Sequence, residues 1–171
     1  KCQSDLRSNM SWGMYNSYIK LKTIFDMNKD TILKDCVIYG PVIELFNCDN
    51  KYNIAVEATA QNKLFYWVVD NENTAQKCIE LLRRHKCGRV TFMPLNRIQD
   101  KLIPREYPRS TDIVPMIKLL QYDDILQPAF EQIFSNTLVT RDIETGFEFA
   151  IRDRFQCTTL GGDVVNTQGG L

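Results

Sequence analysis

Residues 64–93 have the sequence LFYWVVDNENTAQKCIELLRRHKCGRVTFM, which predicts a strand, a helix and a second strand in succession. Leu64 to Val69 form a continuous apolar run of the length typical of a buried strand. Asn73 or Thr74 then caps a helix whose predicted apolar face consists of Ala75, Cys78, Ile79 and Leu82. Gly88 ends this helix, and the second strand runs from Arg89 to Met93.

The same alternation continues toward the N-terminus. Apolar residues at steps of three and four between Leu6 and Phe25 predict a helix. Residues 36–46 predict two strands joined by a bend at Gly40-Pro41. Residues 52–60 have the apolar spacing of another helix.

It also continues toward the C-terminus. Residues 125–134 and 146–155 are predicted helices, and Phe147, Ala150 and Ile151 form the apolar face of the second one. Residues 137–140 and 157–160 are predicted strands. After Gly161-Gly162, residues 163–171 are rich in glycine and predict a hairpin-like sheet edge.

Prolines at 104, 108 and 115 mark residues 97–115 as the predicted linker between two halves. The pattern therefore predicts an α+β (mixed α/β) fold with two lobes, each a small sheet flanked by helices. We expect a helical lead-in over residues 1–37, lobe I with its linker over 38–115, and lobe II over 116–171.

Composition excludes several classes of protein. The formal net charge is zero, so overall charge predicts neither nucleic-acid nor membrane binding. No apolar run approaches the ~18 residues of a membrane span. The six cysteines contain no C-x-x-C pair, which favours reduced intracellular thiols over a disulfide framework. Cys78, His85 and Cys87 lie close in sequence but lack an obvious fourth zinc ligand.

The sequence contains no recognisable catalytic or cofactor-binding motif. His85 is the single histidine and lies at a basic helix end, which disfavours a Ser/His/Asp or Cys/His arrangement. Neither type of glycine-rich phosphate loop is present. We therefore expect no catalytic residue, metal or cofactor, and an interaction module rather than an enzyme. The alternative is a small-molecule-binding or enzymatic α/β domain with an unrecognised site.

One local cluster of cations is a candidate DNA contact. It consists of Arg83, Arg84, Lys86 and Arg89. Basic clusters are the electrostatic footprint of phosphate binding, although most such runs are simply solvated helix faces.

Several strings, in order and spacing, resemble one family. They are Tyr39–Leu45 (YGPVIEL), Ala55–Ala60 (AVEATA), Arg89–Arg97 (RVTFMPLNR), Ile113–Ile117 (IVPMI) and Thr158–Asp163 (TTLGGD). Together they resemble the hinge domain of structural-maintenance-of-chromosomes (SMC) proteins, most of all that of cohesin. The family usually has glycine where Gln61 stands and often where Asn136 stands, so a locally different turn is expected at Gln61.

The resemblance implies a protein that works by pairing. It implies a heterodimer with the hinge of the partner cohesin SMC subunit, in which each chain gives two contact faces around a small central channel. The family's glycine pattern matches Gly162 and Gly169, and its last glycine pair is expected beyond Leu171 in a longer protein with a separate head ATPase. The implied location is the nucleus and chromosome, and the implied interface residues are Gly162, Val164, Val165, Gly169, Gly170 and Leu171.

Overall fold

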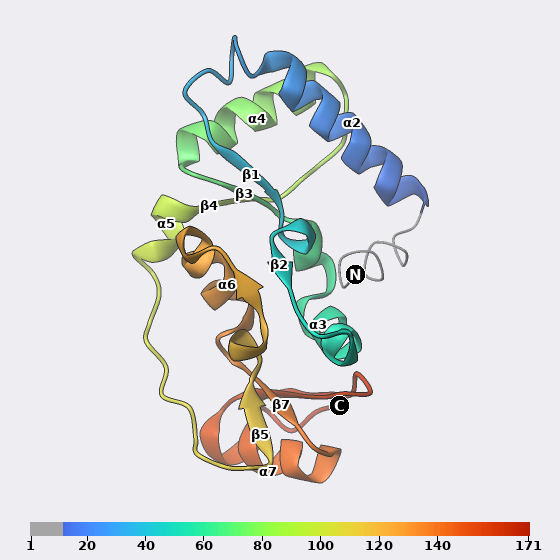
Figure 1. Cartoon of the computed structure of the whole chain (residues 1–171), viewed down its shortest axis with the longest axis vertical. Helices are drawn as coiled ribbons and strands as arrows, with labels where there is room; N and C mark the ends of the chain where they lie inside the picture. The colour runs from blue at the N-terminus through green and yellow to red at the C-terminus, as the bar shows by residue number, and fades with distance from the viewer. Residues whose placement is uncertain (1–11) are drawn as a thin grey trace.

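The computed structural model describes residues 12–171, which form three small sheets covered by helices (Figure 1). The first helix is α2 (Trp12–Asn28), so the predicted N-terminal helix is present, while Leu6 and Met10 of its expected stripe lie outside the described residues. The mixed α/β fold class is confirmed. No helix in residues 12–171 is both long and apolar enough to cross a membrane.

The first sheet has the strand order β1-β3-β4. Strand β3 (Trp67–Val69) pairs antiparallel with β1 (Ile38–Pro41) and parallel with β4 (Phe92–Pro94). Because β3 and β4 are parallel, the chain must cross over between them, and α4 (Glu72–Arg84) is that crossover. Figure 1 shows α2 and α4 together on one side of this sheet. Their buried faces meet around Phe25, whose ring lies 5.3 Å from that of Trp67.

Several details of residues 64–93 differ from prediction. The strand is shorter, because residues up to Phe65 form the 3-10 turn η3 (Gln61–Phe65), which begins at Gln61 with a φ of +48°. The cap of α4 is Asn71, whose side chain accepts from the Thr74 backbone N–H at 3.0 Å. Ile79 is exposed at 38%, and Leu81 takes its place in the core.

The end of α4 also differs from prediction. Helix α4 ends before Gly88, with Lys86 in the left-handed region at φ +51°. The Lys86 and Cys87 amides donate to the carbonyls of Arg83 and Leu82, a pattern that satisfies the last turn of a helix.

The second large sheet has the order β5-β7-β8-β9. Strand β7 (Thr137–Thr140) pairs antiparallel with β5 (Ile113–Pro115) and parallel with β8 (Gln156–Thr159), and β9 (Val164–Val165) completes the edge antiparallel to β8. The predicted hairpin-like edge is thus present.

Helix α7 (Ile143–Asp153) is the crossover of this sheet, but its buried face differs from the predicted one. Gly146, Phe149 and Ala150 are buried, whereas Ile151 is exposed at 62%. A Cβ on Gly146 would lie 3.4 Å from atoms of Cys157, Thr140 and Val165, so glycine lets the helix lie close to the sheet. Of the predicted face, Ala150 is buried and Phe147 packs partly buried against the same core, so only Ile151 was placed wrongly.

The remaining elements join the two large sheets. They are the two-stranded sheet of β2 (Phe46–Asn47) with β6 (Gln121–Tyr122), the helices α3 (Asn53–Ala60), α5 (Leu95–Gln99) and α6 (Gln127–Phe134), and the 3-10 turns η1 (Val42–Glu44), η2 (Asn50–Tyr52), η4 (Met116–Leu119) and η5 (Asp124–Leu126). Phe130 on α6 stacks on Tyr122 at 4.2 Å and lies edge-on to Phe46 at 5.8 Å. Residues far apart in sequence therefore share one core.

The predicted linker contains no helix or strand between Gln99 and Ile113 in the described chain. The last three residues of the predicted linker form strand β5, which pairs with β7. The division into residues 1–37, 38–115 and 116–171 stays a prediction, because strand pairing alone does not delimit domains.

The aromatic contacts of Phe130 between the halves predict a large loss of stability when its side chain is truncated. Phe130 is completely buried, so Phe130→Ala should lower the free energy of unfolding by about 3–5 kcal/mol. Met27→Ala is the control, because Met27 is 74% exposed and should change it by less than ~0.5 kcal/mol. Denaturant titration followed by circular dichroism measures both, and equal effects would contradict the assigned core.

The cap of α7 predicts a pH dependence. The Asp142 side chain accepts from the Thr145 backbone N–H at 2.8 Å, and its hydrogen bonds with Thr145 and then Arg141 lower its pKa to about 2. A carboxylate whose pKa is lowered in the folded state stabilises the fold at pH values above its unfolded pKa of ~3.9. This stabilisation is lost as the pH falls toward 2. The stability difference between the wild type and Asp142→Ala should therefore be constant above about pH 5 and shrink between pH 4 and 2. Denaturant midpoints measured along this pH series provide the test, and a pH-independent difference would contradict it.

Candidate partner-binding interface

The C-terminal segment, residues 160–171, forms an exposed sheet edge. Strand β9 pairs with β8 on one side and with no strand of residues 12–171 on the other. An unpaired edge leaves backbone donors and acceptors available to a strand from another chain. The structure therefore brings the predicted interface residues together at one edge.

Gly162 positions this edge against α3. Its φ is +92°, and its amide donates to the Thr159 carbonyl at 3.0 Å in the turn between β8 and β9. A Cβ at Gly162 would lie only 2.9 Å from Cγ2 of Ile54 on α3. Beside it, the hydroxyls of Thr59 and Thr158 are hydrogen-bonded at 2.9 Å. Gly162 is thus required by contacts within this chain, whatever it contacts in a partner.

The two valines of β9 have different environments. Val165 is 1% exposed and packs in the core with Leu138, Phe149 and Cys157. Val164 is only partly buried. Of the predicted pair, Val164 therefore offers side-chain surface to a partner, while Val165 holds the strand on its own sheet.

A tight turn follows β9. The Asn166 carboxamide oxygen accepts from the amides of Gln168 and Gly170, each at 2.9 Å, and the Asn166 amide donates to the Gly170 carbonyl. Gly169 has a φ of +80°, which disfavours any other residue there. Leu171 then projects with 79% of its surface exposed. Leu171 is consequently the largest apolar contact that this segment offers.

The predicted DNA contact lies at the other end of the molecule, on the last turn of α4 and the loop after it. Arg83, Arg84, Lys86 and Arg89 are all exposed. Arg84 is paired with Glu80 at 2.6 Å, and both side chains are largely exposed. An exposed ion pair of this kind contributes little, so Arg84 stays available to another anion.

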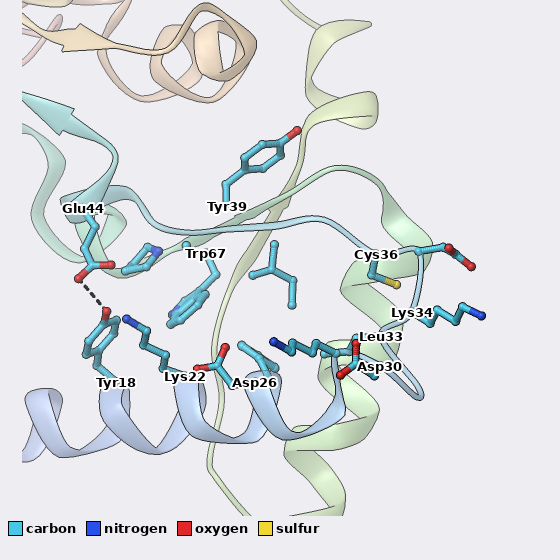
Figure 2. Close-up of a pocket in the computed structure, with 16 residues that line it drawn as sticks. Tyr18, Lys22, Asp26, Asp30, Leu33, Lys34, Cys36, Tyr39, Glu44 and Trp67 are labelled. Atoms are coloured by element: carbon cyan, nitrogen blue, oxygen red, sulfur yellow. Dashed lines mark hydrogen bonds between the residues drawn. The ribbon is translucent and has the colours of Figure 1, made fainter.

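A hollow of about 520 Å³ with many charged residues in its lining lies between α2 and β1. Figure 2 shows Lys22, Asp26 and Asp30 around its rim, and the Tyr18 hydroxyl donating to Glu44 at 2.7 Å. Lysines and carboxylates alternate in its lining, so they form neither a nucleophile with an adjacent base nor a site of uniform charge. The hollow therefore gives no support to the alternative of an enzymatic domain.

The two buried thiols are also unsuited to nucleophilic chemistry. Cys78 and Cys157 are buried, and burial raises their pKa values to about 12 and about 11, which keeps both protonated. The five cysteines within residues 12–171 are free. No group of three His, Cys, Asp or Glu residues in that range is arranged to hold a metal.

Sequence reasoning missed two features of the interface region. Ile54 and Thr59 support the C-terminal edge from α3, which lies about a hundred residues earlier, and no local pattern links them. The unpaired edge of β4 was also missed, because strand order within a sheet is not visible in a single sequence. Asn136, where the family often has glycine, does not have a positive φ, and its buried side-chain oxygen has no hydrogen-bond partner within residues 12–171.

The Gly162 turn yields a prediction with a matched neighbour as control. Gly162→Ala should destabilise the chain by about 1–3 kcal/mol, because it combines a positive φ with a clash against Ile54. Gly161→Ala should be nearly neutral, since its Cβ would meet nothing nearer than 3.8 Å. Thermal unfolding of the two variants makes the comparison, and equal melting temperatures would contradict the assigned packing.

Curated proteins similar to this chain include fungal and plant ones. The chain is 42% identical over 134 residues to Structural maintenance of chromosomes protein 3 of Arabidopsis thaliana, covering 78% of this chain and 11% of that protein. It has the same identity and coverage with a Cryptococcus neoformans protein named Urease accessory protein 2. The chain thus spans about a tenth of the length of these relatives.

Solved structures agree with the fold. A structure described as "Folded elbow of cohesin" superposes with a TM-score of 0.78 at 30% identity, covering 98% of this chain and 24% of that one. An SMC hinge domain of Geobacillus stearothermophilus, described as an asymmetric dimer, superposes with a TM-score of 0.70 at 23% identity, covering 98% and 75%. The second likeness concerns the fold alone.

The match to a family model identifies the family of this chain. The family model "SMC proteins Flexible Hinge Domain" matches residues 36–150, which include the first large sheet, the core between the halves, and β5 and β7 of the second sheet. This match favours an interaction module over an enzyme, as the absence of catalytic motifs predicted. Since the match covers well over half of the sequence, this chain belongs to the family of SMC flexible hinge domains.

Proposed function

We propose that this chain pairs with the hinge domain of the partner cohesin SMC subunit. In the full-length protein, this pairing closes the cohesin ring for sister-chromatid cohesion and chromosome organisation in the nucleus. The observation that carries the proposal is that, within residues 12–171, β4 of the first large sheet and β9 of the second each have one side without a strand partner.

The two edges lie in different parts of the molecule. Figure 1 places β4 beside α5 in one half and the C-terminal segment with β9 in the other. If β9 of each chain pairs with the corresponding β4 edge of the other, an approximate two-fold axis gives two similar contacts and closes the dimer. Two contacts held apart by the body of each hinge leave a channel between them.

The other sheet edges are less suited to pairing. Strand β1 has an irregular register between Ile38 and Gly40 and ends in Pro41, and bulges and prolines protect an edge against a second strand. Strand β5 ends in Pro115, which lacks a backbone donor. Pro94 also ends β4, but each of the three residues before it, Thr91, Phe92 and Met93, has a backbone N–H.

Replacing Leu171 tests the C-terminal half of this contact. Leu171→Arg should weaken association with the partner hinge at least tenfold, because it places a charge among apolar contacts. Leu171 is exposed in the single chain, so the variant should stay folded, whereas Gly169→Glu would also strain the turn at φ +80°. Isothermal titration calorimetry measures the affinity.

Met27→Arg is the matched control, since Met27 is also a largely exposed apolar residue but lies on α2. Light scattering of the wild type with the partner hinge should give a 1:1 complex. Wild-type affinity in Leu171→Arg would remove this segment from the interface. A wild-type chain that stays monomeric with the partner but melts at higher temperature with a small molecule would favour the alternative function.

A weak contact with DNA is a second proposal, supported by the exposure of Arg83, Arg84, Lys86 and Arg89 at one end of α4. The double change Arg83→Glu with Arg84→Glu should abolish binding to a short duplex at low salt, because phosphate contacts dominate non-specific affinity. Lys29→Glu with Lys34→Glu is the control. It makes the same change of net charge just after the C-terminal end of α2 and should leave most of the binding intact. Fluorescence anisotropy at two salt concentrations measures this, and equal losses in both variants would contradict a localised contact.

A further inference from the structure

A hollow of about 390 Å³ runs beside the unpaired edge of β4. Its apolar lining comes from three elements and the start of the linker, namely Phe92 and Met93 of β4, Ile98 of α5, Ile133 of α6, and Leu102. Met93, Ile98 and Ile133 keep 6–8% of their surface exposed, in contrast to neighbouring core residues such as Phe130 and Phe134 at 0%. The floor of the hollow is therefore core surface that is open to a side chain from outside.

The rim of this hollow carries a single sign of charge. Lys63, Arg97 and Lys101 line it, and no carboxylate does. Arg97 is paired with Glu72 at 2.6 Å, outside the lining. Within residues 12–171, neither Lys63 nor Lys101 has a carboxylate within 4 Å. An apolar floor with unpaired ammonium groups fits a ligand segment that is apolar at one position and acidic at another.

The backbone beside the hollow restricts the shape of that segment. Strand β4 offers hydrogen-bonding groups along its open edge, and a peptide added there is extended. In an extended peptide, alternate side chains point to the same face, so one apolar side chain enters the hollow while a flanking residue reaches the rim. The occupant is thus an edge strand with an apolar residue and a carboxylate close together.

A second copy of this chain meets this requirement poorly. Its edge segment, residues 161–171, contains one acidic residue, Asp163. The Asp163 carboxylate already accepts from the Thr159 hydroxyl at 3.2 Å in the β8–β9 turn. Homodimerisation would therefore bring Lys63 and Lys101 next to a segment whose one carboxylate is held in its own turn. Such a difference between partners gives specificity.

We propose that the hollow beside β4 selects the partner hinge over a second copy of this chain, by taking an apolar side chain and a carboxylate from the partner's edge strand. This inference rests on the proposed hinge pairing and adds to it the chemistry of the partner segment. The same electrostatic match speeds association and makes it dependent on salt.

The double variant Lys63→Glu with Lys101→Glu tests the proposal in the 171-residue chain. It should weaken binding to the partner cohesin SMC hinge at least tenfold at low salt and flatten the dependence of Kd on sodium chloride. Lys63→Arg with Lys101→Arg should retain most of the wild-type affinity, because it keeps the positive charge at both positions. Lys29→Glu with Lys34→Glu, an equal change of charge away from the hollow, should also retain it. Circular dichroism verifies the fold of each variant.

The outcomes separate the inference from the function on which it rests. If the wild type forms no 1:1 complex with the partner hinge in sedimentation velocity, the proposed pairing itself fails. If the wild type pairs but the Glu variant binds equally well with the same salt dependence, the pairing stands and the selective role of the hollow is refuted. If the Glu variant pairs normally but loses binding to a short DNA duplex, the rim serves nucleic acid and the inference is overturned.

Discussion

The fold depends on the packing of α6 against residues from the opposite half of the chain. Phe130 contacts Phe46 of β2 and Tyr122 of β6, and the same buried cluster includes Val56 of α3 and Val42 of η1. This shared core fixes the distance between the two large sheets. It therefore also fixes where the unpaired edges of β4 and β9 lie relative to each other, which a dimer with two contacts requires.

The glycines of the C-terminal segment show how internal packing and pairing share residues. Gly162 allows the turn after β8 to lie against Ile54, and Gly169 allows the turn closed by Asn166. Both conformations are needed within one chain, so glycine at these positions is not by itself evidence of a partner. What remains available outside is the backbone of β9, part of Val164 and the side chain of Leu171.

Sequence patterns predicted the elements better than their packing. Residues 137–140 were predicted correctly as β7, because a short β-branched run between turn residues leaves few alternatives. The buried faces of α4 and α7 were partly wrong, since spacing does not distinguish Ile79 from Leu81, or Ile151 from Phe149, without the position of the sheet. Contacts such as Thr59 with Thr158 and the open edge of β4 depend on residues distant in sequence, so they required the structure.

The central claim is that two strand edges of this chain pair with a partner hinge. Hydrogen–deuterium exchange of the chain with and without the partner cohesin SMC hinge measures this directly, because edge amides exchange slowly once they donate to another strand. We predict slower exchange in the complex for the amides of Thr91–Met93 and of Val164–Val165 that point outward, with little change in the buried strands β3 and β7. A 1:1 complex in which neither segment gains protection would contradict the account.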